Sequence, residues 1–353
     1  KAHLAQLSPL GTLDRITGFD KDKRQITIDA KSIEGLNLKG DRLEMFLCQR
    51  WAVAILRVKD IKNGVMTFHE PESELEFSHP WPQPVVEGDN RSAYTLRNAY
   101  SFLNEQDEWY QDGDKIYYYS ETGAPRNVVI PYLTSLLNIE GSEETPVENL
   151  TIENICFEHT AWLRPSLEGL VTLQGGFRLL DAYKLPIEGL YHKAGLENQA
   201  WIARAEMAVG VKNCRNIAFD RCTFQHFGAT ALDLVDTVSA ITNCHFQDIG
   251  GTALQLGTFP DGPFETHIPY IPANPQRLCN NILIKGNTIH DATNEDWGCV
   301  GISAGYVSDV VIEENHVYDL NYSGICVGWG WTKLDSSMKR NIIRNNQDND
   351  FAL

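Results

Sequence analysis

The stretch Phe219–His226 reads F-D-R-C-T-F-Q-H, and Ile241–Asp248 reads I-T-N-C-H-F-Q-D after a step of 22 residues. Each begins with an apolar anchor, has a second apolar residue five places on, and ends with His or Asp seven places on. Asn, Arg, Gly or Glu fills the second position after the anchor. Four more stretches share this pattern, except that the last has Asp348 at the fifth place: Ile152–His159, Ile284–Asp291, Ile312–Asp319 and Ile343–Asp350. Self-similarity at roughly 20–30 residues indicates a stacked repeat, in which no single unit buries its own apolar face.

A second strand-like segment follows the His or Asp position in four of the repeats. The four segments are Ala231–Leu234, Ala253–Leu256, Gly301–Ala304 and Gly324–Val327. Because side chains alternate across a strand, Leu232 and its equivalents should form an interior column. Asp233 and its equivalents should point the opposite way, out of the coil; these equivalents are Gln255, Ser303 and Cys326.

Short strands stacked at steps near 22 residues predict an all-β fold, a right-handed parallel β-helix over residues 141–353. Leucine-rich repeats would need their own L-x-x-L-x-L frame, and propeller blades run to about 40 residues or more. The sixth repeat carries Asp348 where the other five have an apolar residue, and the chain stops at Leu353 before another strand. A solenoid needs a polar cap on its last coil. Either this end is the cap or the chain is a fragment of a longer protein; we favour the fragment and expect the β-helix to be truncated at its C-terminal end.

Residues 1–140 lack the repeat and predict an N-terminal, mostly β accessory lobe that is barrel- or sandwich-like. Within it, Asp107–Tyr119 suggests a hairpin that turns at Asp112–Asp114. The aromatic residues of this segment could form a carbohydrate-stacking face. A hairpin core is favoured, because alternating aromatic residues suit a half-buried strand.

The chain is acidic, with a net charge of −17 and a pI near 5.0. This charge argues against nucleic acid and anionic membranes as partners, since both require basic patches. It also weakly disfavours polyanionic substrates such as pectate. The sequence contains no run of 18 or more apolar residues, so it predicts no membrane-spanning helix. We also find no signal-peptide pattern at Lys1.

The eight cysteines lie mostly inside predicted strands. Cys222 and Cys244 share one repeat position, so we expect reduced thiols that stack as small interior residues. No CxxC pair or Cys/His spacing predicts a zinc site. We therefore expect no cofactor; Ca²⁺ at the acidic turns stays open, although no loop has the spacing to support it.

Asn294–Gly298 reads N-E-D-W-G, and Tyr322–Trp331 reads Y-S-G-I-C-V-G-W-G-W. With Asp107–Tyr119 and Glu265–Tyr270, these segments resemble a large group of bacterial right-handed parallel β-helix repeat proteins, and the resemblance covers nearly the whole chain. Characterised relatives look like β-helix glycoside hydrolases, notably a family with α-L-fucosidase and xylanase activities. The resemblance implies a β lobe near the start of the β-helix, a periplasmic or extracellular location, and a pair of acidic catalytic residues. Family members usually continue past the position of Leu353 into a coil bearing D-x-(A/G)-G-I-Y, which this chain lacks.

Two insertions, 258–279 and 292–297, interrupt the repeat, and we expect them at the same end of the second strand. Insertions on a solenoid project from one face and usually build its site. Carboxylates beside aromatic rings are what sugar hydrolysis uses. The expected substrate-binding residues are Glu265, His267, Glu295, Trp297, Tyr322, Trp329 and Trp331.

Three carboxylates are candidates for catalysis. Asp296 comes first, and its alternative role is a turn residue that caps backbone amides. Asp319 comes second, although His or Asp fills its position in every repeat, which a repeated turn contact would explain. Asp233 comes third, with exposure on the sheet face as its alternative. His226 and His159 belong to the repeated position and are expected to be structural.

These features favour an exported carbohydrate-active enzyme, a glycoside hydrolase that acts on plant or host polysaccharide through a carboxylate pair in a cleft on the β-helix. The alternatives are a polysaccharide lyase, a non-catalytic glycan-binding β-helix and a purely structural solenoid. A lyase would need Lys, Arg or Ca²⁺ to neutralise a uronate, whereas the predicted cleft is acidic and aromatic. The sugar, the linkage, the stereochemical outcome and the oligomeric state stay open.

Overall fold

The computed structural model describes residues 2–8, 12–38, 42–79, 83–182, 200–260, 262, 264–265, 270–328 and 335–351. The fold is all-β, and the chain divides into two compact units. Unit 1 comprises Lys1–Val129 and Leu163–Thr172, and unit 2 comprises Ile130–Trp162 and Leu173–Leu353. Within the described ranges, no helix is both long enough and apolar enough to cross a membrane.

Unit 1 contains the hairpin that the aromatic segment predicts. Its strands are β9 (Glu108–Asp112) and β10 (Lys115–Tyr118), and β1 (His3–Leu4) pairs with β9. Lys115 pairs with Asp112 across the antiparallel ladder, so Gly113 and Asp114 form a two-residue loop. The left-handed φ of Gly113, 58°, is the conformation that such tight turns require. The hairpin prediction is confirmed.

The remaining strands of unit 1 form mainly antiparallel ladders. The first ladder runs in the order β2 (Asp14–Arg15), β8 (Ala93–Arg97), β5 (Glu44–Cys48), β6 (Val53–Lys62) and β14 (Leu170–Gln174). The second joins β3 (Gly18–Asp20), β4 (Gln25–Thr27) and β7 (Val65–Phe68) to the end of β6. The helical segments are η1 (Ala30–Ile33), α1 (Glu72–Ser78), η2 (Tyr100–Phe102) and α2 (Arg164–Glu168).

The segment 163–172 belongs to unit 1. The sequence predicts a single boundary after residue 140, and such a boundary would assign this segment to the other unit. Leu170 pairs with Ile55 in the ladder between β14 and β6. The Ser166 hydroxyl donates to the buried Glu44 carboxylate, and the Arg57 guanidinium donates to the Leu167 carbonyl. These contacts join residues more than 100 positions apart, so no local sequence signal marks the segment.

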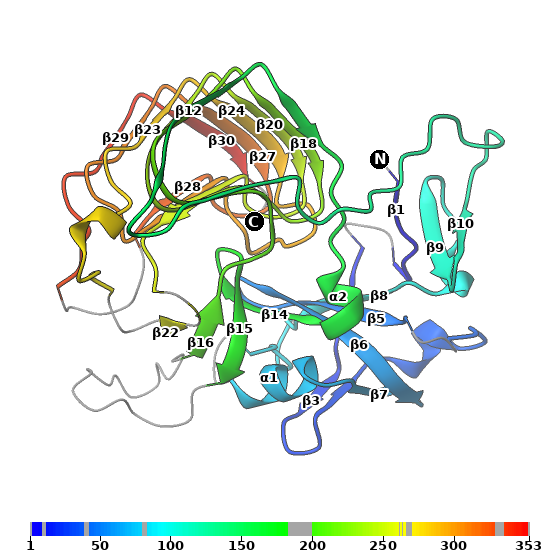
Figure 1. Ribbon diagram of the computed structural model, residues 1–353. Coiled ribbons are helices and arrows are strands. Elements are labelled where there is room, and N and C mark those ends of the chain that lie inside the picture. Colours follow the sequence, from blue (N-terminus) through cyan, green and yellow to red (C-terminus); the bar gives the residue numbers. More distant parts are fainter. Residues whose placement is uncertain are drawn as a thin grey trace. The chain divides into compact units, whose positions relative to one another are not determined.

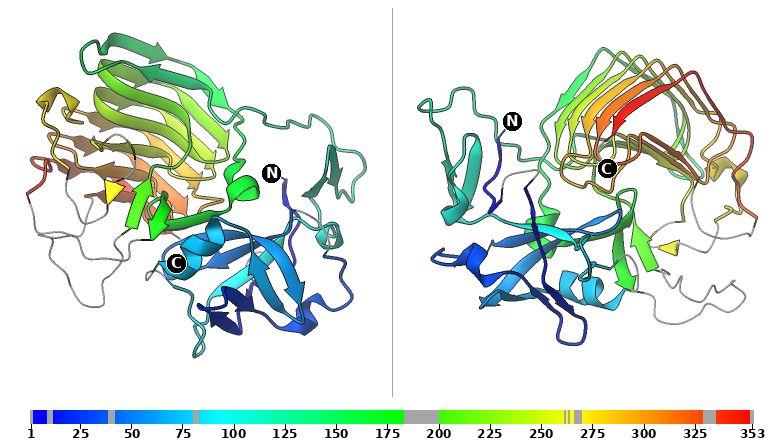
Figure 2. Two further views of the ribbon diagram at one scale, coloured as in Figure 1. Left: turned by 60° about the horizontal axis from the view of Figure 1, so that its bottom comes forward. Right: turned by 180° about the vertical axis from the view of Figure 1, so that it is seen from behind.

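Unit 2 is built around two parallel sheets (Figures 1 and 2). The first contains β11 (Leu137–Glu140), β12 (Val147–Glu153), β17 (Met207–Asp220), β19 (Thr230–Thr242), β21 (Leu254–Gly257), β23 (Leu283–Lys285), β25 (Ile302–Gly305), β26 (Val311–Glu313), β28 (Ile325–Val327) and β29 (Ile342–Arg344). The second contains β13 (Cys156–Glu158), β18 (Thr223–Phe227), β20 (His245–Ile249), β24 (Thr288–Ala292), β27 (His316–Leu320) and β30 (Gln347–Phe351). Smaller elements are β15 (Phe177–Ala182), β16 (Ala200–Ala203), β22 (Phe264–Glu265) and η3 (Pro275–Arg277).

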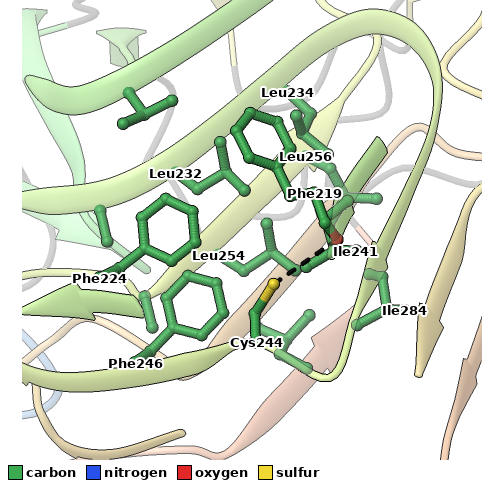
Figure 3. Close-up of a cluster of buried hydrophobic side chains, with 14 of the residues drawn as sticks. Phe219, Phe224, Leu232, Leu234, Ile241, Cys244, Phe246, Leu254, Leu256 and Ile284 are labelled. Atoms are coloured by element: carbon green, nitrogen blue, oxygen red, sulfur yellow. Dashed lines mark hydrogen bonds between the residues drawn. The ribbon is translucent and has the colours of Figure 1, made fainter. Parts of the chain in front are cut away.

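The register of these sheets stacks equivalent residues of successive repeats. Leu232 pairs with Leu254, which is followed in register by Ile302 and Ile325, as the alternation predicts. In the second sheet Phe224 pairs with Phe246, and the two rings stack with centroids 4.6 Å apart (Figure 3). The interior columns form one continuous apolar core, so each repeat buries its apolar face against its neighbours.

The predicted thiol stack is confirmed in this core. Cys222 and Cys244 are free thiols and are both buried. The Cys244 thiol donates to the Phe219 carbonyl over 3.5 Å (Figure 3), and burial raises the pKa of Cys244 to about 12. Cys244 therefore packs as a small, unreactive interior residue.

Two backbone positions explain the sequence signature of the repeat. The second residue after every anchor has a left-handed φ of 52–67°, in Asn154, Arg221, Asn243, Gly286, Glu314 and Asn345. The His or Asp position has a left-handed φ of 49–65° in the first five repeats, in His159, His226, Asp248, Asp291 and Asp319. Gly, Asn, Asp and His adopt this conformation more readily than other residues. The repeated His or Asp is therefore a turn residue, which supports the structural interpretation of His159 and His226.

Candidate active site

Four turns of unit 2 lie at one edge of the stacked strands. Each connects a strand of the second sheet to the next strand of the first, and together we call them the turn edge: 228–229, 250–253, 293–301 and 321–324. The strands on both sides of these turns are parallel, so equivalent turns stack on one another. Turn 293–301 is the longest, and it contains Glu295, Asp296 and Trp297.

Backbone hydrogen bonds join turn 293–301 to the shorter turn 250–253 of the preceding repeat. The amides of Glu295 and Asp296 both donate to the Gly250 carbonyl over 2.9 Å. Gly250 in turn packs directly on Gly228, because a Cβ at Gly250 would lie 2.1 Å from the Gly228 carbonyl oxygen. The position of Asp296 is thus determined by backbone contacts between neighbouring repeats and not by its own loop alone.

The Asp296 carboxyl group is buried, with 5% of the residue exposed. Burial raises its pKa to about 6, although hydrogen bonds from the Cys299 thiol and the Gly298 amide oppose this shift. The Gly298 amide donates to Oδ1 over 3.1 Å. Asp296 therefore caps a backbone amide, as its alternative role predicts, and also carries a proton up to a higher pH than an exposed Asp.

A segment that the sequence analysis missed also contacts the turn edge. The Gln174 side-chain amide donates to the Tyr322 hydroxyl over 3.3 Å, and the Gly175 amide donates to the Gly298 carbonyl over 3.0 Å. Gly176 has a φ of 81°, and a Cβ there would lie 2.9 Å from the Cys299 sulfur atom. The Gly175–Gly176 pair is a turn signal in the sequence, but only the structure shows what the turn covers.

Two further side chains lie at the turn edge: Glu206, directly before β17, and Trp162, which packs against Gly228. Glu206 is half-buried; its carboxylate accepts from the Trp162 indole over 3.3 Å and lies 3.9 Å from Arg178. Its backbone carbonyl accepts from the Thr230 amide at the start of β19. Neither Glu206 nor Trp162 was expected at the site, because both flank segments that lack the repeat.

The other predicted residues of turn 293–301 also lie at this edge. Trp297 is half-buried, and its indole donates to the Asn294 carbonyl over 3.2 Å. Glu295 is half-buried beside Gly250. Glu295 and Asp296 thus lie in turn 293–301, and Glu206 lies beside turn 228–229 through its bond to Thr230. Trp297 and Trp162 accompany them.

Asp319 and Asp233 occupy different surroundings from Asp296. Asp319 is exposed at the left-handed turn position that recurs in the first five repeats. Asp233 points away from the core as predicted, yet only 2% of it is exposed, so the alternative of exposure on the sheet face is wrong. Arg204 holds it in a two-contact ion pair, in which Nε donates to Oδ2 over 2.8 Å and Nη2 donates to Oδ1.

The expectation that both insertions crowd the same end of the second strand is wrong. Residues 258–279 leave the carboxyl end of β21, whereas turn 293–301 precedes the amino end of β25. These two strands are parallel, so the insertions begin at opposite ends. Glu265 lies in β22, whose backbone pairs with Trp201 of β16. His267, Trp329 and Trp331 lie outside the described residues, as does the Glu265 side chain.

Among the residues that the structure describes, no group of three or more His, Cys, Asp or Glu side chains could hold a metal ion. The turn edge carries three carboxyl groups, those of Glu206, Glu295 and Asp296. One has a raised pKa and the other two, Glu206 and Glu295, are half-buried.

Two comparisons with known proteins find similarity to glycoside hydrolases. Residues 2–121 match the family described as the GH141 insertion domain. A solved structure titled "Glycoside hydrolase" is similar to 96% of this chain, with 36% identity and a TM-score of 0.88. The chain covers 60% of that protein's length. No curated protein matches the chain. Both similarities support a glycoside hydrolase family.

The raised pKa of Asp296 predicts a pH-dependent effect of Asp296→Asn on stability. The folded chain binds the Asp296 proton more tightly than the unfolded chain does. Protonation of Asp296 therefore stabilises the fold fully below about pH 4, and this contribution is lost as pH rises through about 6. A shift of about 2 units corresponds to about 3 kcal/mol. Asn does not ionise. The free energy of unfolding of the variant, relative to that of the wild type, should therefore be about 3 kcal/mol higher at pH 8 than at pH 4. Urea unfolding at both pH values measures this gain.

Asp319→Asn is the matched control for this experiment, because Asp319 is an exposed Asp of the same sheet system. Its stability relative to the wild type should be the same at pH 4 and pH 8. A pH-independent difference for Asp296→Asn would show that the carboxyl group titrates as an ordinary exposed Asp.

Proposed function

We propose that this protein is a glycoside hydrolase whose active site is the turn edge of unit 2. The observation that carries the proposal is the buried Asp296 carboxyl group, whose pKa is raised to about 6. A general acid works best when its pKa lies near the operating pH. Asp296 would protonate the glycosidic oxygen of the leaving group, as one member of a carboxylate pair does in such enzymes.

A second carboxylate is needed as nucleophile or base, and we propose Glu206 for this role. It lies on the same edge as Asp296, is oriented by the Trp162 indole, and retains partial exposure for contact with substrate. Glu295 is the alternative from the turn that carries Asp296. The repeated left-handed conformation of Asp319 supports a turn role, and the ion pair of Asp233 with Arg204 supports a positioning role.

The finer features of the fold and substrate belong to the same proposal. In-register stacking of equivalent residues supports a right-handed parallel β-helix for unit 2. The substrate would be an oligo- or polysaccharide of plant or host origin. Such polymers do not enter the cytoplasm intact, so the proposed location is the periplasm or the cell exterior of a bacterium. Fractionation of the native host would test this location.

A screen of the chain against aryl glycosides and plant oligosaccharides tests the activity, with α-L-fucosides and β-xylosides included. Products are read by mass and by ultraviolet absorbance. Release of an ordinary saccharide supports the hydrolase, whereas unsaturated, absorbing products identify a lyase instead. Saturable glycan binding without any product would indicate a non-catalytic glycan-binding protein, and the absence of both would leave a structural solenoid.

A further inference from the structure

A polar column runs along the outward face of the strands that follow the turn edge. Asp233 of β19 pairs with Gln255 of β21, which pairs with Ser303 of β25. Cys326 of β28 continues the column. Each of these residues lies between two core residues of its strand and therefore points away from the core. Asp296 precedes Ser303 by seven positions, so the column begins directly beside the proposed catalytic turn.

Gln255 is buried in this column, and its side chain has no hydrogen-bond partner among the residues that the structure describes. Only 1% of the residue is exposed, and neither Oε1 nor Nε2 forms a hydrogen bond. The Nη1 atom of Arg204, whose other nitrogen atoms bind Asp233, is also buried without a partner. Folded proteins satisfy nearly all buried polar groups, so these atoms point to a partner outside the described part of the chain.

The surroundings of Gln255 define the chemistry of that partner. Arg204 and Asp233 compensate each other's charge, so the column offers no net charge to a ligand. The Arg204 guanidinium lies 4.5 Å from the centre of the Phe259 ring. Phe259 belongs to a buried aromatic cluster with Phe264 and Tyr306, at centroid distances of 4.7 and 5.7 Å. Polar groups beside an apolar wall are typical of small-molecule sites.

We infer that this column is a subsite for an uncharged sugar residue with adjacent hydroxyl groups, and that Gln255 determines its specificity. A primary amide accepts through its oxygen and donates through its nitrogen, so Gln255 matches a pair of neighbouring hydroxyls. The carboxylate of an anionic sugar only accepts hydrogen bonds, so it could not donate to Oε1 of Gln255. It would also lie beside the negatively charged Asp233. The identity of the ligand as a sugar rests on the proposed function.

Calorimetry with six sugars tests the subsite directly. The neutral probes are D-glucose, D-galactose, D-xylose and L-fucose, and the anionic probes are D-glucuronate and D-galacturonate. The wild-type chain should bind at least one neutral sugar at least tenfold more tightly than either uronate. Gln255→Leu should weaken that binding at least tenfold. Absence of binding by all four neutral sugars, or equal binding by the variant, overturns the inference.

Gln247→Leu is the matched control, and thermal unfolding separates binding from a structural role. Gln247 lies in β20, and its side chain donates to Gln225 over 3.0 Å. Its replacement should leave sugar affinity unchanged. Gln255→Leu removes an unsatisfied buried amide, so it should raise the Tm of the sugar-free chain by a few degrees. A lower Tm would show that Gln255 stabilises the fold, which contradicts the inference.

Cys326 reports the location of the bound sugar. It is a half-buried free thiol at the end of the column, whereas Cys156 is an exposed thiol of the second sheet. A saturating neutral sugar should slow alkylation of Cys326 by iodoacetamide at least threefold and leave Cys156 unchanged. Equal rates for Cys326 with and without sugar place the ligand elsewhere and overturn the inference. Loss of hydrolysis alone would count against the proposed function, because binding and protection are measured without turnover.

Discussion

Asp296→Asn is expected to lower kcat/KM by about 10²–10⁴-fold on the glycoside that the wild-type chain cleaves. Asn cannot donate the proton that the leaving group requires, while its side-chain oxygen still accepts from the Gly298 amide. The fold should therefore persist, and far-ultraviolet circular dichroism should match the wild type. Steady-state kinetics on an aryl glycoside with a poor leaving group measures the loss.

Two comparisons make this result specific to Asp296. An aryl glycoside with a good leaving group needs less proton donation, so the same variant should retain more of its activity on that substrate. Asp319→Asn changes an exposed carboxylate of the same chain and should retain wild-type kinetics. Full activity of Asp296→Asn on both substrates would remove Asp296 from the mechanism.

Asp233→Asn is expected to lower the free energy of unfolding by about 3–5 kcal/mol. The change removes the charge that compensates Arg204, and only 15% of the Arg204 side chain is exposed. Removing one partner of a buried ion pair leaves an uncompensated buried charge, which is why the loss is large. Urea unfolding followed by intrinsic fluorescence measures it.

The double variant Asp233→Asn with Arg204→Met distinguishes this cause from a packing defect. Removing both charges should recover most of the stability that the single change costs, because no isolated charge stays buried. The control pair is Asp309 and Arg340, whose ion pair is more exposed, and Asp309→Asn should lower the free energy of unfolding much less than Asp233→Asn does. A double variant as unstable as Asp233→Asn alone would show that the charge pair is not the cause.

The local features of unit 2 could be predicted because each depends on a short-range rule. The paired columns of Leu232 and Leu254 follow from the alternation of side chains along a strand. The Asn, Gly, His and Asp positions follow from the left-handed φ that each turn requires. In unit 1, the hairpin in which Lys115 pairs with Asp112 likewise depends on a two-residue turn.

The candidate site could be predicted only in part. Turn 293–301 is predictable because it interrupts the repeat, and Asp296 is a candidate because it stands beside Trp297. The contacts of Gln174 with Tyr322 and of Glu206 with Trp162 join segments far apart in the chain. No repeat relates these residues, so no spacing could bring them together.

The sequence by itself determined which residues face the core and where each repeat turns, because backbone sterics and side-chain alternation act over a few residues. The tertiary structure alone decided the chemistry. Asp296 and Asp319 are both turn aspartates in the sequence, yet one is buried with a pKa of about 6 and the other is exposed. Burial, charge compensation and hydrogen-bond satisfaction depend on what packs against a side chain, and those neighbours come from distant parts of the chain.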